Sequence, residues 1–446
     1  MLPGTALESL EAGGAGCGVS WTGEQLPTHL RATRAPTSRV DGLARASRKA
    51  GDQVVDPDRN SRPVVPDYGG ACLSSLLHAL DARASPEAPG WLPEAAKGAR
   101  QVVLLVLDGV GWEKLRAARS LAPTLCEAEG GPITSVAPTT TATALTSITT
   151  GRAPAEHGVV GYRLRVPDGD AGSHGSSARS PQGAASDWEV LNVLRWRTGR
   201  GDARRLIPAP AFQPIPPFGG AKAVAVTRAE FAATGFTALH LAGAKLVGWA
   251  LPSTLVVQVR RLLAQGEPLV YAYYDGLDKV AHAHGLGDFY SEELRAVDRW
   301  VGDLAESLPP GCALVVTSDH GQVEVGPSVR LPGPELLEHT EMLSGEGRFR
   351  WLHARPGATS DLLSAASEAH GSEAWVLTRE QIVEEGWFGG PLAPHVAARL
   401  GDVALVAREP VAFLDPADTG ETRLAARHGS LTPAEMYVPL IAWRAA

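Results

Sequence analysis

Three short apolar runs, each ending at acidic residues, constrain the fold of this chain more than any other feature of its sequence. The runs cover residues 102–107, 269–274 and 313–317. Apolar runs of this length are typical of strands that are buried on both faces of a parallel sheet. Stretches with helical periodicity at 254–266 and 291–308 precede the second and third runs. This alternation predicts an α/β fold in which helices sandwich a mostly parallel central sheet.

The composition excludes several classes of protein. A net charge of −8 over 446 residues leaves no basic footprint for nucleic acid. Cys17, Cys72, Cys126 and Cys312 are scattered, so they indicate neither a disulfide framework nor a zinc ribbon. The chain has no apolar stretch long enough to span a membrane, and its first residues do not resemble a secretory signal. We therefore expect a cytoplasmic protein that binds neither nucleic acid nor membranes.

Changes in composition along the chain predict its domain organisation. Residues 1–63 are rich in Gly, Ala, Arg, Ser and Pro, which predicts a disordered or loosely attached extension. We expect a catalytic core at 64–324 and 403–446, with a last core strand near 403–406. Residues 325–402 alternate strand-like and helical pieces and are predicted to form a small α/β cap inserted into that core. Polar and proline-rich stretches within 163–220 predict loops over one face.

The acidic ends of the apolar runs predict where the site lies, because ligands bind beyond the carboxyl ends of the strands in open parallel sheets. Each motif alone has an ordinary explanation as a turn, a surface pair or a capping residue. Together they offer enough nitrogen and oxygen ligands for two divalent metal ions. Such a set favours zinc, although manganese and iron use the same ligands. The candidate ligands are Asp108, Asp278, His282, Asp319, His320 and His428.

A threonine-rich run, PTTTATALTSITTG at 138–151, lies between the first and second of these motifs. It predicts a helix whose first turn begins near Thr139–Thr141, and a helix N-terminus attracts anions. A hydroxyl at that position beside a metal ion can act as a nucleophile toward phosphorus. The alternative is that these threonines only cap and pack the helix. We prefer that alternative for Thr143, Thr146, Thr149 and Thr150.

The order of the motifs resembles a known family. In sequence they read LVLDGVGW, the threonine run followed by GRAPAEHGVVGY, then YYDGLDKVAHAHG, VVTSDHG and ARHG. This order resembles the alkaline phosphatase superfamily, and within it the type I phosphodiesterase/nucleotide pyrophosphatase branch. The resemblance covers about residues 66–444 and implies a two-zinc hydrolase of phosphoesters.

The resemblance also implies roles for individual residues. It makes Asp108, Asp319 and His320 the ligands of one zinc ion. The ligands of the other zinc ion are then Asp278, His282 and His428. The second threonine of the family's T-x-T motif is its nucleophile, which corresponds to Thr141, with Thr140 as the alternative register. Hydrolysis then proceeds through a phosphothreonine intermediate, with a small phosphoester, such as a nucleotide, as substrate.

The chain departs from the family pattern in two places. Ala142-Thr143-Ala144 replaces an aromatic-Pro-Asn segment, and Tyr162 stands where the family has an asparagine near the phosphate. Tyr162 is therefore our candidate substrate-binding residue, and nucleotide specificity is open. A phosphomonoesterase and a non-catalytic metal-binding relative are the alternative functions. Two further alternatives concern side chains near the site. Asp275 and His284 either orient ligands or are bystanders, and Trp196, Phe212 and Phe218 either contact substrate or pack beneath loops.

Overall fold

The computed structural model describes residues 62–168, 188–418, 420 and 423–445. The predicted extension at 1–63 therefore falls almost entirely outside the described residues, as does the polar stretch at 169–186. Cys72, Cys126 and Cys312 are buried free thiols. Within the described part of the chain, no helix is both long and apolar enough to cross a bilayer.

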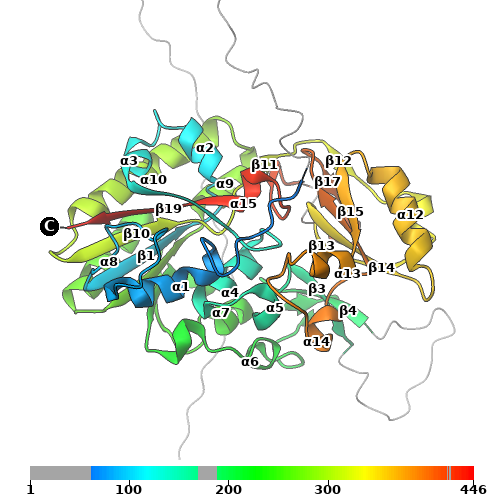
Figure 1. The fold of residues 1–446 in the computed structure, drawn as a ribbon, viewed down its shortest axis with the longest axis horizontal. Coiled ribbons are helices and arrows are strands. Elements are labelled where there is room, and N and C mark those ends of the chain that lie inside the picture. The colour runs from blue at the N-terminus through cyan, green and yellow to red at the C-terminus, as the bar shows by residue number, and fades with distance from the viewer. Residues whose placement is uncertain (1–61, 169–187, 419, 421–422, 446) are drawn as a thin grey trace, which may run out of the picture. The chain divides into compact units, whose positions relative to one another are not determined.

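A seven-stranded sheet forms the centre of the fold (Figure 1). Five neighbouring strands run parallel, while the β19 strand pairs antiparallel with both of its neighbours. The α/β fold with a mostly parallel sheet is thus confirmed. In spatial order the strands are β2 (Glu129–Thr134), β19 (Tyr437–Arg444), β10 (Cys312–Thr317), β1 (Gln101–Leu107), β9 (Leu269–Tyr274), β7 (Val224–Arg228) and β8 (Lys245–Trp249).

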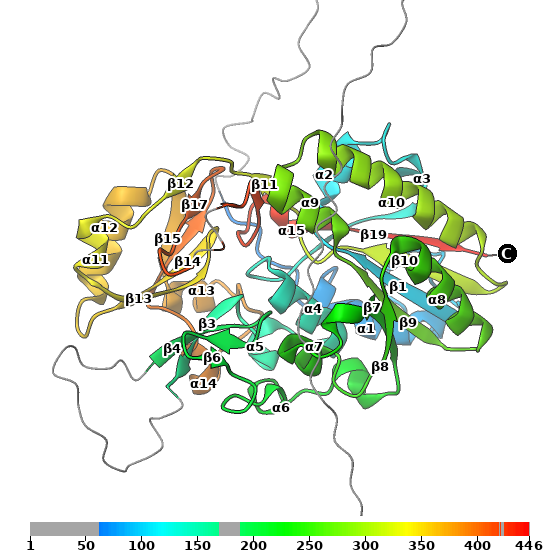
Figure 2. The ribbon, with the colours of Figure 1, turned by 180° about the vertical axis from the view of Figure 1, so that it is seen from behind.

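Helices cover both faces of this sheet. Successive side chains of a strand point to opposite sides, so a wholly apolar strand has two apolar faces to bury. Val102, Leu104 and Val106 of β1 pack into one core, and the residues between them pack into the other. Figures 1 and 2 show the two helical layers. One layer contains α1 (Leu73–Asp81), α4 (Thr141–Thr150) and α7 (Gly235–His240). The other contains α2 (Trp112–Ala117), α3 (Pro123–Glu127), α8 (Pro252–Ala264), α9 (Gly276–His284) and α10 (Asp288–Glu306).

A second, four-stranded antiparallel sheet lies beyond the carboxyl ends of the central parallel strands (Figure 1). The strand predicted near 403–406 exists, but its expected place in the central sheet is wrong, because it pairs with β14 and β15. The limits of the predicted cap as a domain stay a prediction. The second sheet contains β13 (Thr340–Glu346), β14 (Phe349–Ala354), β16 (Val403–Ala407) and β15 (Ala374–Thr378), with α12 (Thr359–His370) and α13 (Arg379–Glu384) beside them.

Of the two stretches within 163–220 that are predicted to form loops, the polar one lies outside the described residues. Segments next to these stretches form a third, antiparallel sheet that the sequence did not predict, and cross-strand pairing stabilises it. These strands are β3 (Arg163–Pro167), β4 (Trp188–Asn192), β5 (Arg197–Thr198) and β6 (Gly201–Asp202). The shorter remaining elements are β11 (Val323–Glu324), β12 (Val329–Arg330), β17 (Ala412–Phe413), β18 (Ala426–Arg427), α5 (Pro154–His157), α6 (Ala209–Phe212), α11 (Pro334–Leu337), α14 (Pro394–Ala397) and α15 (Pro433–Met436).

Candidate metal centre and active site

The first group of site residues lies at the carboxyl ends of the adjacent strands β1 and β10. Asp108 follows β1 directly, and Asp319 follows β10 after one serine. The Nε2 atom of His320 lies 3.4 Å from Asp108 Oδ1 and 3.4 Å from Asp319 Oδ2. All three side chains are buried. The parallel pairing of β1 with β10 therefore brings together the three residues that the resemblance assigns to one metal ion.

Two carboxylate oxygens in this group indicate a cation site. Asp108 Oδ1 and Asp319 Oδ2 are buried without a hydrogen-bond partner among the described residues. The other oxygen of each is held, since Tyr273 donates its hydroxyl to Asp108 Oδ2. The amides of Gly109 and His320 donate to Asp319 Oδ1 at 3.2 and 3.1 Å. Buried oxygens without a partner are costly, and a bound cation removes that cost, so this donor set fits a divalent metal ion.

The second group combines one face of α9 with the segment after β18. Asp278 and His282 lie one turn apart on the helix, with 3.3 Å between Asp278 Oδ1 and His282 Nε2. His428 Nε2 lies 3.8 Å from the same oxygen. The candidate ligand atoms of these three residues all lie within 4.8 Å of one another. The structure thus brings together the second predicted ligand set as well.

Backbone carbonyls orient the imidazole rings of all three candidate histidine ligands. His282 Nδ1 lies 2.8 Å from the carbonyl oxygen of Ala426, and His428 Nδ1 lies 2.8 Å from that of Thr139. His320 Nδ1 lies 3.0 Å from the carbonyl oxygen of the following residue. A ring that donates its Nδ1–H to a carbonyl keeps the lone pair of Nε2 for a metal ion.

The two groups are adjacent, because Asp278 of the second group also lies close to two residues of the first. Ligand atoms of Asp108, Asp278 and His320 also lie within 4.8 Å of one another. The rings of His320 and His428 stack with 3.5 Å between their centroids. This proximity suits a pair of metal ions at one site. The division of the six residues into three ligands for each ion stays a prediction.

Burial and crowded charge perturb the pKa values of this cluster. Burial, reinforced by the neighbouring carboxylates of Asp319 and Asp278, raises the pKa of Asp108 well above its usual value. Burial also raises the pKa of Asp278. The pKa of His428 is held well below its usual value by burial and then by His320 and His282. Divalent cations would favour both the ionised carboxylates and the neutral imidazoles.

Thr141 is the first residue of α4, and Thr140 is its N-cap, as the threonine run predicts. The Thr141 hydroxyl oxygen lies 3.2 Å from His320 Nε2, which places it beside the first ligand group. The ligand atom of the histidine and the hydroxyl therefore face one another at the N-terminus of a ten-residue helix.

The other threonines of the run have different surroundings. Thr146, Thr149 and Thr150 each donate to the carbonyl oxygen of the residue four positions earlier, at 2.6–2.9 Å. Thr139 donates to the carbonyl oxygen of Ser430 at 2.7 Å. The hydroxyl of Thr143 is buried and has no partner among the described residues. Of these hydroxyls, only that of Thr141 is within hydrogen-bond distance of a candidate metal ligand in the described structure.

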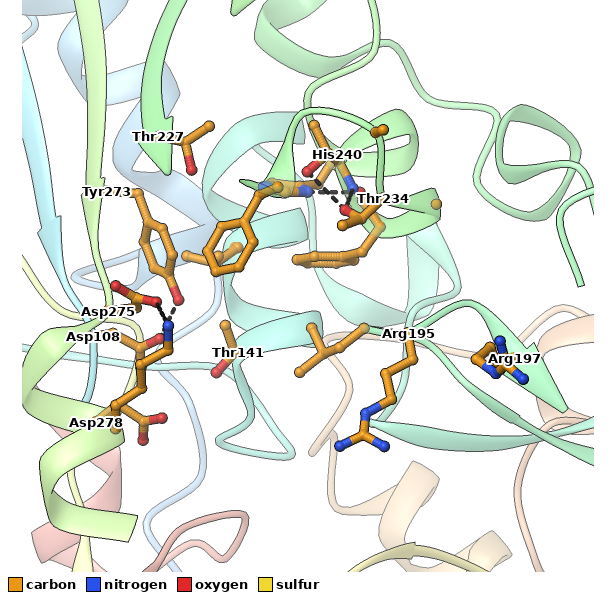
Figure 3. Close-up of a pocket in the computed structure, with 18 of the residues that line it drawn as sticks. Asp108, Thr141, Arg195, Arg197, Thr227, Thr234, His240, Tyr273, Asp275 and Asp278 are labelled. Carbon is orange, nitrogen blue, oxygen red and sulfur yellow. Dashed lines mark hydrogen bonds and ion pairs between the residues drawn. The ribbon is translucent and has the colours of Figure 1, made fainter. Parts of the chain in front are cut away.

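Two cavities meet at Thr141. The larger, of about 600 Å³, is bounded by Asp108 and Asp278 on one side. Its apolar wall consists of Leu145, Leu194, Phe231 and Phe236. Figure 3 shows Thr141 between the acidic residues Asp108 and Asp278 on one side and Arg195 on the other.

The smaller cavity, of about 250 Å³, is lined by Thr140, Thr141, His428 and Tyr162. The hydroxyl oxygen of Tyr162 accepts a hydrogen bond from the Asn192 amide at 2.6 Å. Tyr162 therefore reaches the site, and its binding of substrate stays a prediction.

The remaining sequence candidates lie outside the metal-ligand groups. Asp275 pairs with Arg228 and Lys279, at 2.6 Å from each, and lines the larger cavity. His284 is exposed and stacks on Phe289. Trp196, Phe212 and Phe218 are buried in the core, where they pack.

Sequence reasoning missed three residues of the site. Tyr273 donates to Asp108, and Gln322 donates to Asp278 Oδ1 at 2.7 Å. Arg195 lines both cavities. Gln322 could have been found from its place two residues after His320. Arg195 lies on a distant hairpin, and no local pattern signals it.

The motifs that form this site lie within a stretch that one known family shares. A model of the type I phosphodiesterase/nucleotide pyrophosphatase family matches residues 102–431. The chain belongs to this family. Its members are metal-dependent phosphoester hydrolases of the alkaline phosphatase superfamily, which confirms the resemblance drawn from the motifs. A comparison with curated proteins returned no match.

Solved structures share the fold. Murine ectonucleotide pyrophosphatase/phosphodiesterase 5 is 18% identical, with a TM-score of 0.56 over 78% of this chain and 88% of that one. An inactive threonine-to-alanine variant of that protein has been solved in complex with AMP. Phosphonoacetate hydrolase from Sinorhizobium meliloti 1021, in complex with phosphonoformate, is 20% identical. Its TM-score is 0.54 over 78% of this chain and 91% of that one.

Proposed function

We propose that this protein hydrolyses phosphodiesters or pyrophosphates, nucleotides among them, at a two-zinc centre, with Thr141 as nucleophile. The observation that carries the proposal is the 3.2 Å approach of the Thr141 hydroxyl to His320 Nε2, where two cavities meet at a helix N-terminus. The cytoplasmic location expected from the sequence is part of the same proposal.

The residues of the site divide the work. Asp108, Asp319 and His320 would hold one ion, and the second ligand group would hold the other. Such ions lower the pKa of a hydroxyl or water and stabilise charge that develops on phosphoryl oxygens. Thr141, once deprotonated, attacks phosphorus, and the bond from phosphorus to the leaving oxygen breaks as the new bond forms. The amides of the first turn of α4 face the phosphoryl group and favour its negative charge.

Water then cleaves the phosphothreonine, which restores the hydroxyl and releases the phosphoryl product. The larger cavity would take the organic part of the substrate, since its volume lies within the range of small-molecule sites and its wall includes Phe231 and Phe236. The AMP complex of the murine relative supports a nucleotide as one such substrate.

Hydrolysis of bis(4-nitrophenyl) phosphate by the zinc-loaded protein tests the proposal. We expect turnover that a chelator abolishes, because without metal ions the Asp and His side chains do not activate the Thr141 hydroxyl. Thr141→Ala should lower kcat by at least about 100-fold, in line with the loss of a positioned reacting group, and keep its zinc. Thr140→Ala is the matched control. The Thr140 hydroxyl is one residue away, and in the described structure it makes no hydrogen bond to a candidate metal ligand.

Full activity in Thr141→Ala would remove Thr141 from its proposed role. A larger loss in Thr140→Ala than in Thr141→Ala would assign the nucleophile to Thr140. If the wild-type protein binds zinc and cleaves neither diesters nor monoesters, the proposed reaction is wrong and a binding role is favoured.

A further inference from the structure

Arg195 lies where the two cavities of the site join. It lines the larger cavity with Asp108 and Thr141, and the smaller one with Thr141 and His428. The side chain is exposed, and Figure 3 shows it on the far side of Thr141 from Asp108 and Asp278. A substrate whose phosphorus lies at Thr141 would therefore have the acidic cluster on one side and this guanidinium on the other.

The Arg195 guanidinium has no hydrogen-bond or ion-pair partner among the described residues. Other arginines near the threonine run in sequence are engaged. Arg152 pairs with Glu156 at 3.5 Å, and Arg163 pairs with Asp415 at 2.5 Å. Because the charge of Arg195 is not neutralised by a carboxylate of the described chain, it remains available to an anion in the cavity.

The backbone beneath Arg195 is fixed by its neighbour Trp196. Trp196 is fully buried and has a φ of 53°, a left-handed conformation that a side chain other than glycine seldom adopts. Its indole nitrogen donates to the carbonyl oxygen of Ile207 at 2.8 Å. A Cβ on Gly235 would come within 2.3 Å of the indole, so only glycine fits against it. Strained residues held in this way are concentrated at ligand-binding sites.

Hydrogen bonds before Trp196 also tie this turn to the site. The Arg195 amide donates to Asn192 Oδ1 at 2.9 Å. The Asn192 side-chain amide donates to the hydroxyl of Tyr162, which lines the smaller cavity. Arg195 is thus mounted on a turn that is anchored on both sides, and this arrangement suits selective binding of a charged group.

We propose that Arg195 binds a second anionic group of the substrate, close to the phosphorus that Thr141 attacks. This inference rests on the proposed function and adds the substrate class: phosphoesters with more than one negative charge next to the scissile bond. That charge is on the same phosphorus in a monoester and on the next phosphorus in a pyrophosphate. A simple diester carries one negative charge and gives Arg195 no second group to bind.

Three substrates and one control variant test this selectivity. Loss of a charge-assisted hydrogen bond should lower kcat/KM of Arg195→Ala by about 10- to 100-fold for 4-nitrophenyl phosphate, for ATP, or for both. The rate with bis(4-nitrophenyl) phosphate should change by less than about threefold, within ordinary context variation. The affected substrate identifies whether a monoester or a pyrophosphate supplies the charge. Arg195→Lys should recover part of the loss, and Arg152→Ala should lose nothing, because Arg152 lines neither cavity.

Binding provides a readout that is independent of turnover. The two ligands are AMP, whose phosphate carries two negative charges, and cyclic AMP, whose phosphate carries one. Both are titrated into zinc-loaded Thr141→Ala protein, which cannot turn them over through Thr141. Calorimetric titration should show that a further Arg195→Ala substitution weakens AMP by about tenfold or more and leaves cyclic AMP unchanged.

Equal losses for singly and doubly charged ligands, or no loss for either, would overturn the assignment of Arg195. The proposed function can fail separately. If the wild-type protein cleaves none of the substrates but Arg195→Ala selectively weakens AMP, the reaction is wrong and the anion site stands.

Discussion

At the scale of single residues, hydrogen bonding distinguishes threonines of α4 that the sequence alone does not distinguish. Three threonines of α4 return their hydroxyls to the helix backbone, a common use of threonine within helices. Thr141 and Thr143 lie in the first turn of the helix, where there is no preceding helical carbonyl for their hydroxyls to bond. Position in the helix leaves both hydroxyls free of the backbone, and of the two only that of Thr141 lies within hydrogen-bond distance of a candidate ligand in the described structure.

His157 gives a pH-dependent contribution to stability. Its Nε2 lies 2.8 Å from the Ser147 hydroxyl oxygen, and its Nδ1 accepts from the amide of Val159. Burial, with a smaller effect of Arg399, lowers the pKa of His157 from 6.5 to about 3. Between about pH 6.5 and pH 3 the unfolded chain binds a proton that the folded protein does not. The free energy of unfolding therefore falls by up to about 1.4 kcal/mol for each unit by which the pH is lowered in this range.

Urea unfolding at pH 7 and pH 5 measures this contribution. In His157→Gln, the decrease of the unfolding free energy between the two pH values should be smaller than in the wild type by about 2 kcal/mol. His395→Gln serves as control, because His395 is exposed. An unchanged pH dependence in His157→Gln would show that His157 does not titrate as described.

At the scale of elements, a buried ion pair joins the second sheet to the loop that carries His428. Arg348, in the turn between β13 and β14, donates to both carboxylate oxygens of Glu435 at 2.7 and 2.8 Å. Both side chains are fully buried. Glu435 also accepts from the amide of Ser430, two residues after His428. The ion pair thus ties the hairpin, α15 and a ligand-bearing loop together.

Glu435→Gln should lower the unfolding free energy by about 3–5 kcal/mol, because it leaves the Arg348 charge buried without its carboxylate. The double variant Arg348→Met/Glu435→Gln should recover part of this loss. The ion pair between Arg295 and Glu292 is exposed, so Glu292→Gln should leave the urea midpoint unchanged. Equal effects of Glu435→Gln and Glu292→Gln would contradict the buried pair's role.

The elements also show which parts of the fold local pattern can predict. Strands β1, β9 and β10 were predictable, because each is an apolar run that ends at acidic residues. The strand β16 has the same apolar character, with all five residues buried, yet it pairs in the second sheet. Its pattern indicates a buried strand, and only pairing with β14 and β15, distant in sequence, decides which sheet contains it. The third sheet was missed because two of its strands are five residues long and two are only two residues long, which is too short for a periodic pattern to show.

At the scale of the whole molecule, the same limit applies to the site. The ligand residues were predictable, because carboxyl ends of parallel strands converge at one edge of a sheet. Residues that reach the site from elsewhere, such as Arg195, depend on how a hairpin folds over that edge. Sequence therefore predicts the chemistry of this site better than it predicts the selectivity, which the surrounding segments determine.

Metal binding should stabilise the whole fold, because the ligands come from segments that span residues 108–428. An ion that binds only the folded protein at about 100 times its Kd adds about 2.7 kcal/mol, and for a chain of this size this predicts a rise in Tm of about 3 °C. The ligand atom of Asp278 lies within 4.8 Å of those of His282 and His428 and of those of Asp108 and His320. Asp278→Asn should therefore lose most of the rise, whereas the exposed Asp361→Asn should keep it. Calorimetry with zinc and with chelator measures the shift. An equal rise in Asp278→Asn would mean that zinc binds elsewhere on the chain.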